Sequence, residues 1–449
     1  MKRLRCLLLA LSLPALPALA QTVPGGPPLV PNRVDGFGAP VGAAVPVNRA
    51  ADETTFDILG SYYQQEGTHG AVEGGRGTEH LYDVSPTIVV NVPLDTVGRF
   101  SANIGADYYA SASTDRIDYA LSTPSAHDVR IHGDFGYTRQ QRAAGTQWGA
   151  GAGVSKEYDY LSLNVAGSFA KTSRDGNRQL SLAGQVFQDQ VTLITPAELR
   201  PGYVPGAVPR PIKSSYGTDN RRSYNFTASY AQVLTKRLQL SFSTELVLQQ
   251  GLLSTPFHRV YFRDNPTPNP VAAVDEASFA PLAPSAPRIE ALPRQRLKYP
   301  VGLRLTWFAS DPVQLRAYYR FYNDDFGIQA HTAELELPLK ATPFLTLYPF
   351  YRYHQQTAAR YFAGYLGHSV QEEFYTSDYD LSAFTAHKAG LGLRYAPLYG
   401  LGRFRLPLHD AQQRPRLLRL RELNLRYAYY RRSTDLTANI FTFDLGFSL

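Results

Sequence analysis

Apolar and polar side chains alternate along Phe100–Ala110, FSANIGADYYA. Successive side chains of a β-strand point to opposite faces, so the pattern predicts a strand with one apolar face and one polar face. Strands of soluble proteins average about five or six residues. A tilted strand that crosses a bilayer needs about 9 to 11 residues. The length and the alternation together indicate a transmembrane strand.

The same alternation recurs along the chain, for example from Leu238, from Tyr299 and after Pro312. We predict an all-β fold, a transmembrane antiparallel up-and-down β-barrel of about 16 strands with a range of about 14 to 18, because single-chain bacterial barrels have an even number. The strands are expected to begin near Phe56, Pro86, Phe100, Asp128, Thr146, Tyr160, Gln179, Ser223, Leu238, Tyr299, Val313, Gly327, Phe344, His387, Leu420 and Ala438.

The C-terminal residues carry a second signal. Apolar residues alternate to the last position of the chain, at Phe441, Phe443, Leu445, Phe447 and Leu449. This resembles the terminal strand by which the barrel-assembly machinery recognises outer-membrane barrels, with leucine at the position where phenylalanine is more usual. A last strand that pairs with the first leaves no exposed sheet edge.

The N-terminal residues predict export. A basic start is followed by the apolar run Leu7–Leu13 and by Ala18-Leu19-Ala20, a peptidase recognition pattern, so Gln21 is the expected first mature residue. The apolar run is too short to span a bilayer. We expect a signal peptide at 1–20, a Pro/Gly-rich periplasmic lead-in at 21–52 and the barrel at 53–449. An uncleaved N-terminal anchor is the alternative.

Composition excludes several classes of protein. Cys6 is the only cysteine and lies in the expected signal, so the mature chain has no disulfide and no thiolate metal site. Loss of Lys2, Arg3 and Arg5 lowers the formal charge from +7 to +4, which gives no case for nucleic-acid binding. The lead-in is too short for the plug of an energised transporter. A periplasmic or secreted β-protein remains an alternative, but it would require repeats that we do not find.

Connection lengths assign the two ends of the barrel. With the N-terminus in the periplasm, short links near Asp95, Asp175, Lys236, Asp311 and Thr342 fall on the periplasmic side. Long links fall outside, as expected for this class, at 112–127, 191–222, 250–298 and 356–386. Two links disagree: Glu157–Tyr160 is very tight on the outer side, and 397–419 is long on the inner side. One missed or spurious strand would account for either.

Charged residues on the polar faces alternate in sign from strand to strand. Opposite charges on neighbouring strands stand about 5 Å apart and can pair. Two interpretations stay open: a charged pore constriction that filters solutes, or a structural ladder of ion pairs inside a narrow barrel. The candidate lumen residues are Arg304, Arg316, Arg320, Glu334, Glu336, Arg352, Arg394, Glu422 and Arg426.

Other polar groups give weaker signals. The outer loop carries Glu372, Glu373, Asp378 and Asp380, which suit either a bound cation or a solvated acidic loop. Asp324-Asp325 is typical of a turn.

The motifs of metal and catalytic sites are missing. The histidines lack metal-site spacing, and neither a nucleophile elbow nor a phosphate-binding loop occurs. We therefore expect no catalytic, cofactor or metal residues. An outer-membrane lipid-modifying enzyme using His331 or His387 remains a remote alternative.

Several aromatic and charged clusters resemble one bacterial family. They are KEYDYLSL at Lys156–Leu163, YYRFYNDD at Tyr318–Asp325, PFYRYHQQ at Pro349–Gln356, and PFHRVY at Pro256–Tyr261 with Leu292-Pro293-Arg294. The family is an uncharacterised barrel family classed as a domain of unknown function. The resemblance implies an outer-membrane barrel in contact with lipid and transfers no activity.

The functional hypothesis is a porin-like passive channel for small solutes. The alternatives are a non-conducting structural or surface-binding barrel and the lipid-modifying enzyme.

Overall fold

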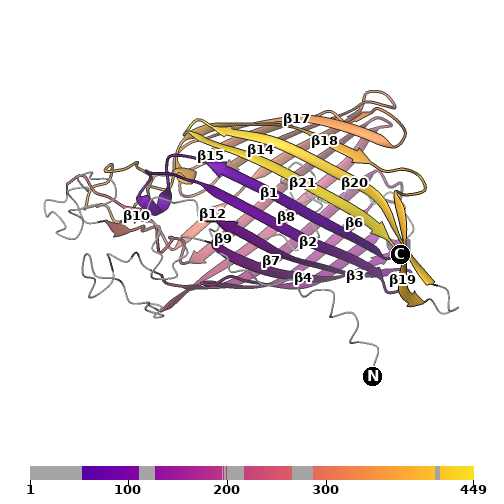
Figure 1. Cartoon of the computed structure of the whole chain (residues 1–449), viewed down its shortest axis with the longest axis horizontal. Helices are drawn as coiled ribbons and strands as arrows, with labels where there is room; N and C mark the ends of the chain where they lie inside the picture. The colour runs from indigo at the N-terminus through magenta and orange to yellow at the C-terminus, as the bar shows by residue number, and fades with distance from the viewer. Residues whose placement is uncertain are drawn as a thin grey trace, which may run out of the picture.

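The computed structural model describes residues 53–110, 127–194, 196, 199, 217–264, 287–409 and 415–449. The chain is all-β and forms one closed antiparallel barrel of 16 strands, as predicted (Figure 1). The expected signal peptide (1–20) and lead-in (21–52) lie outside the described residues. No helix among the described residues is long and apolar enough to cross a membrane.

Each strand pairs with its neighbour in chain order, and each expected strand is found. Two of the sixteen are interrupted at a proline, which has no N–H to donate to the ladder. β12 and β13, around Pro300, both pair with β9, and β15 and β16, around Pro338, both pair with β17. The strands are β1 Thr55–Glu66, β2 Leu81–Pro93, β3 Gly98–Ala110, β4 His127–Gln141, β5 Thr146–Lys156, β6 Tyr160–Thr172, β7 Arg178–Thr192, β8 Thr218–Thr235, β9 Leu238–Gly251, β12 Gln295–Lys298 with β13 Val301–Phe308, β14 Gln314–Asn323, β15 Gln329–Glu336 with β16 Leu339–Lys340, β17 Leu345–Gln356, β18 Phe384–Tyr395, β20 Pro415–Arg432 and β21 Leu436–Ser448.

The barrel closes where the C-terminal strand meets the first strand. β21 pairs with β1 from Thr55 opposite Ser448 to Glu66 opposite Thr437. The Leu449 backbone N–H then donates to the Thr54 carbonyl at 2.9 Å. The prediction that the last strand pairs with the first is confirmed.

The long inner link does not hide a barrel strand. It contains β19 (Gly402–His409), which pairs with the first part of β20, whereas β18 pairs with the later part of β20. β19 therefore forms a hairpin that extends beyond the barrel wall. The tight outer link is a genuine hairpin turn, in which the Glu157 N–H donates to the Tyr160 carbonyl at 2.8 Å. Neither link therefore reflects a missed or spurious strand of the barrel, although the inner link contains the additional strand β19.

The two faces of the wall differ as the alternation predicts. Apolar side chains such as Ile131 and Val165 are exposed on the outside, at 61% and 60% of their surface. Polar side chains such as Asp134 and Asn164 alternate with them, and both are buried on the inside. No described part of the chain covers the outer apolar band.

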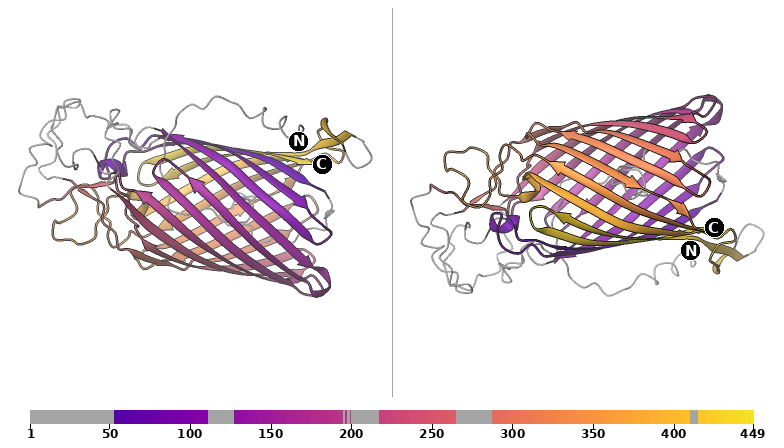
Figure 2. Two further views of the ribbon diagram at one scale, coloured as in Figure 1. Left: turned by 90° about the horizontal axis from the view of Figure 1, so that it is seen from below. Right: turned by 90° about the horizontal axis from the view of Figure 1, so that it is seen from above.

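The long loops pack against one another at one end of the barrel, which we call the loop end. Figure 1 shows β10 (Arg259–Val260) and the short helical turn η1 (Ala71–Glu73) there, opposite the C-terminus. Both views of Figure 2 show the same assembly extending past the strand ends. We call it the cap: residues 67–80, 252–264, 287–294, 324–328 and 357–383.

The cap has apolar clusters of its own. One contains Leu292, Phe326, Ile328 and Ala359, and the other contains Val260, Phe262 and Tyr375. β10 pairs with β11 (Arg288–Ile289), and the cap also contains the helical turn η4 (Tyr379–Leu381). The cap is therefore a packed layer of loops at the barrel mouth.

Candidate functional site: the charged inner wall

Strand register brings two carboxylates of β15 into contact with arginines on both neighbouring strands. Glu336 lies opposite Arg316 of β14, and the Arg316 Nη1 donates to Glu336 Oε1 at 2.8 Å. Glu334 lies opposite Arg352 of β17, whose Nε donates to Glu334 Oε2 at 2.5 Å. The predicted pairing of opposite charges on adjacent strands is present here.

Arg426 joins both carboxylates from a strand that does not touch β15. It lies on β20, which β17 and β18 separate from β15. Its guanidinium is 3.3 Å from Glu336 Oε2 and 3.8 Å from Glu334 Oε1. It stacks 3.6 Å from the centre of the Phe350 ring, which lies over Gly390. A glycine on β18 leaves room for this reach across the inner wall.

We call Arg316, Glu334, Glu336, Arg352 and Arg426 the charge cluster. The glutamates and the arginines of the cluster differ in solvent exposure. The Glu334 and Glu336 side chains are 0% and 2% exposed, whereas Arg316 and Arg352 are 37% and 23% exposed. The arginines cover the carboxylates, so the charge that the lumen presents from this part of the wall is positive.

The remaining predicted lumen residues are spread around the cluster. Arg394 Nη2 of β18 lies 2.5 Å from Glu422 Oε2 of β20. Arg320 Nη2 lies 3.6 Å from Glu245 Oε2 of β9, across the intervening β13. The Arg304 guanidinium lies over the Tyr318 ring, 5.3 Å from its centre.

Sequence reasoning missed Glu245 and Lys388. Lys388 lies opposite Arg352 in the register of β17 and β18 and adds a further cation to this half of the wall. Both residues lie on the polar face of an alternating strand, and this position could have identified them as lumen residues.

The neighbouring part of the wall, which begins at β21 next to β20, is acidic. Its inward positions on the strands β21 and β1 to β4 carry carboxylates, and sequence analysis did not single them out. Arg130 Nε pairs with Asp107 Oδ2 at 2.6 Å, which neutralises one of them. We call this part of the wall the acidic sector: Asp57, Asp83, Asp107, Asp134 and Asp444.

The acidic outer loop does not gather around a single point. Glu372 pairs with His368 at 2.6 Å, and Asp380 pairs with Arg432 at 2.5 Å. Asp378 instead faces His258, and Glu373 is exposed. The cap around Asp378 raises the pKa of this carboxyl to about 7, first by burial and then by repulsion from Asp380. The four residues therefore do not form one site.

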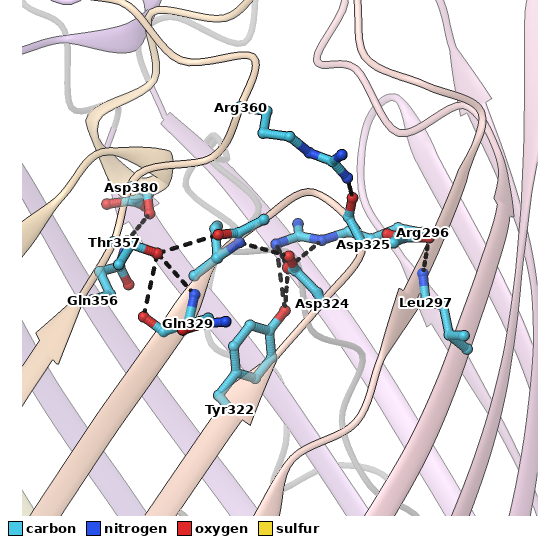
Figure 3. A network of polar contacts seen from close by, with 12 residues as sticks. Arg296, Leu297, Tyr322, Asp324, Asp325, Gln329, Gln356, Thr357, Arg360 and Asp380 are labelled. Carbon is cyan, nitrogen blue, oxygen red and sulfur yellow. Dashed lines mark hydrogen bonds and ion pairs between the residues drawn. The ribbon is translucent and has the colours of Figure 1, made fainter.

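The Asp324-Asp325 turn has a structural role that its sequence did not suggest. Asp324 Oδ2 accepts hydrogen bonds from Arg296 Nη2 at 2.5 Å and from the Tyr322 hydroxyl at 2.7 Å. Asp325 Oδ2 accepts the Leu297 N–H at 2.9 Å (Figure 3). This turn joins β12, β14 and β15 at the mouth of the barrel, where Figure 3 also places Arg360 and Asp380.

The two histidines considered for lipid chemistry have equivalent surroundings. His331 and His387 are both exposed near the loop end, and each Nδ1 pairs with a tyrosine hydroxyl of the next strand. The partners are Tyr319 at 2.7 Å and Tyr351 at 2.6 Å. Such amphipathic pairs suit an aromatic girdle.

The predicted assembly residues alternate on β21 as expected. Phe441 is 42% exposed, and the Phe447 ring lies 5.9 Å from Phe56 of β1. Phe443 and Leu445 are half-buried on the same strand face, and Leu449 follows the end of the strand.

A family model matches residues 84–414, most of the chain, and carries the description "Protein of unknown function (DUF3570)". The chain belongs to this family. The resemblance found in the sequence is thereby confirmed. No curated protein matches the chain.

Solved barrels resemble the chain only distantly. A "Bacterial polysaccharide outer membrane secretin" is 11% identical with a TM-score of 0.43, covering 89% of this chain and 100% of that one. OccK9 (OpdG) of Pseudomonas aeruginosa is 10% identical with a TM-score of 0.39, covering 88% and 98%. A TodX mutant, titled a monoaromatic hydrocarbon channel, is 11% identical with a TM-score of 0.37, covering 88% and 90%.

Proposed function

We propose that the protein is a barrel of the bacterial outer membrane. The uncovered apolar band on the outside, with Ile131 and Val165 among its exposed members, would contact lipid. Short turns such as 236–237 lie at one end, and the long loops of the cap lie at the other. This asymmetry places the short turns in the periplasm and the cap at the cell surface.

Within that setting we propose a passive channel for small solutes, with a preference for anions. The observation that carries the proposal is the exposure difference within the charge cluster. Glu334 and Glu336 are covered, while the guanidiniums of Arg316 and Arg352 face the lumen. A ring or patch of exposed cations in a low-dielectric wall concentrates anions and repels cations.

The acidic sector lies beside the charge cluster around the wall, so the lumen field has a component across the pore. A solute with separated charges would orient in such a field, with its anionic group toward the charge cluster. Small organic anions that also carry a cationic or polar group are therefore the solute class we propose.

The test is the double variant Arg316→Ala/Arg320→Ala in planar bilayers under a salt gradient. We expect the reversal potential to shift toward cation selectivity relative to the wild type. Arg431→Gln is the matched control, because Arg431 is an exposed arginine near the mouth, outside the charge cluster. An absence of conductance from the wild-type protein under every condition would rule out the channel.

The packed cap favours a second candidate function, a non-conducting barrel that binds partners through its surface. Hydrophobic clusters such as that of Val260, Phe262 and Tyr375 give the loops a defined shape suited to recognition. Conductance recordings separate the two functions. A lipase assay on refolded protein tests the remaining hypothesis of a lipid-modifying enzyme.

A further inference from the structure

Three side chains from distant parts of the chain converge inside the cap. His258 and Glu290 come from the connection between β9 and β12, and Asp378 comes from the connection between β17 and β18. Their donor atoms all lie within 4.8 Å of one another. His258 Nδ1 is 3.8 Å from Glu290 Oε1 and 3.9 Å from Asp378 Oδ2.

The histidine nitrogen at the centre of this group lacks a hydrogen bond. The His258 residue is 9% exposed, and its Nδ1 is buried with no hydrogen-bond partner among the described residues. A buried polar nitrogen without a partner is costly, so nearly all such atoms in proteins have one. The two nearest carboxylate oxygens lie beyond hydrogen-bond range and at almost equal distances. A simple ion pair would bring one oxygen to about 2.7–2.9 Å.

Neighbouring groups hold the carboxylates in this arrangement. Glu290 Oε2 accepts the Thr255 N–H at 2.7 Å, and Glu290 Oε1 accepts the Thr376 hydroxyl at 2.5 Å. Asp378 Oδ1 accepts the Asp380 N–H at 2.9 Å, which leaves Oδ2 directed toward His258. Such outer hydrogen bonds orient the carboxylate ligands of metal sites.

The local charge also favours a cation. Among the residues that the structure describes, neither Glu290 nor Asp378 forms an ion pair with a lysine or an arginine. By contrast, the nearby Asp380 forms an ion pair with Arg432, and Glu73 forms one with Arg259. Among the described residues, the two carboxylates thus share one imidazole as their only ion-pair partner.

We propose that His258 Nδ1, Glu290 and Asp378 bind a divalent transition-metal ion, for which Zn²⁺ is the appropriate probe. Imidazole with carboxylate oxygens suits zinc, and three protein ligands leave a fourth position for water. Zinc ligands at about 2.0–2.2 Å stand about 3.3–3.6 Å apart in a tetrahedron. The distances of 3.8 Å and 3.9 Å from His258 Nδ1 to the two carboxylates would therefore shorten by a few tenths of an ångström on binding. The metal would cross-link the two longest cap connections and hold them in one arrangement.

No sequence motif indicates this site. His258 and Glu290 stand far apart in the chain, and Asp378 is farther still, so no local spacing motif exists. The expectation of no metal residues rested on spacing alone, and the proposed site departs from it.

For the test, the full chain is refolded in detergent and stripped of metal with a chelator. ZnCl₂ is then titrated into the protein, and its binding is measured by isothermal titration calorimetry. We expect one zinc per chain. His258→Gln and Asp378→Asn should each weaken binding by at least about tenfold. His80→Gln is the matched control, because His80 is an exposed histidine at the same end that pairs with Glu66, and it should bind zinc like the wild type.

A spectroscopic readout separates the site from adventitious binding. Co²⁺ added in place of zinc should give visible ligand-field absorption that His258→Gln abolishes. Variants that still fold are identified on gels, where they keep the heat-modifiable migration of the wild type. If His258→Gln does not fold, Asp378→Asn provides the test, because asparagine keeps the shape of the aspartate side chain. Absence of zinc binding, or equal binding by wild type and both folded variants, would overturn the proposal. The proposal would also be overturned if the site bound Ca²⁺ and His258→Gln did not change that binding.

Discussion

Gly60 of β1 lies directly opposite Phe443 of β21, and the phenylalanine ring covers the glycine at the seam that closes the barrel. A Cβ atom on residue 60 would collide with Cε1 and Cζ of that ring. The pair therefore links one of the predicted assembly residues to barrel closure, because the ring has its place only when the last strand meets the first.

Gly60→Val should destabilise the seam. Overpacking of this kind costs about 1–3 kcal/mol, because the Phe443 ring must leave its position. The measurement is the temperature at which the folded barrel loses its heat-modifiable migration on gels, which should fall. Gly184→Ala is the control, since its nearest neighbour lies 4.0 Å from the added Cβ. Equal melting of the two variants would contradict the role of the pair.

Arg426→Met should destabilise the inner wall more than Arg394→Met. Arg426 serves two buried carboxylates, and methionine keeps the apolar stem but leaves Glu334 and Glu336 with fewer partners. Removal of one partner from a buried ion pair costs about 3 kcal/mol or more. Arg394 is 41% exposed, so its loss should cost less. The free energy of unfolding of both variants is measured by urea denaturation in lipid vesicles, monitored by tryptophan fluorescence. If Arg394→Met loses as much stability as Arg426→Met or more, the charge cluster is not a structural unit.

Asp324→Asn should loosen the mouth of the barrel. The Asp324 side chain is 0% exposed and pairs with Arg296, which is 11% exposed, so the variant leaves a buried charge without its counter-ion. We expect a loss of about 3–5 kcal/mol and faster proteolysis of the cap. Asp219→Asn breaks the Arg294 pair at the same end, where Arg294 is 61% exposed. An exposed pair contributes only about 0–1 kcal/mol, so this variant should resist protease like the wild type.

The tight turn between β5 and β6 should weaken as the pH rises. Burial raises the pKa of Glu157 to about 7 and that of Asp159 to about 6. Because these values lie above those of the unfolded chain, the folded turn binds more protons. Its stability is fully present below about pH 4 and is lost as the pH rises through the folded values.

Hydrogen exchange of the Tyr158 amide from pH 5 to pH 8 measures this effect. After correction for intrinsic exchange, protection should fall over that range in the wild type. In Glu157→Gln the fall should be smaller, because one of the two titrating groups is gone. The same pH dependence in both proteins would contradict the assignment.

The positions of the strands and the faces of their side chains could be predicted from the amino-acid pattern alone. Alternation of the kind seen at Phe100–Ala110 is local, and in an up-and-down barrel each strand pairs with the next one along the chain. Sixteen strand positions, the closing role of the C-terminal strand and the inward placement of Arg316, Glu334 and Arg352 therefore followed from period and length.

Contacts between groups that are not on neighbouring strands could not be predicted in this way, because they depend on the folded barrel as a whole. Closure of the wall lets Arg426 reach Glu334 across two strands, and loop packing brings His258 to Asp378. Similarly, β19 pairs with β20 outside the wall although its sequence alternates like a barrel strand. The physical reason is that a contact across a lumen or between loops depends on how the whole sheet curves and where each loop returns. Neither of these leaves a periodic pattern in the sequence.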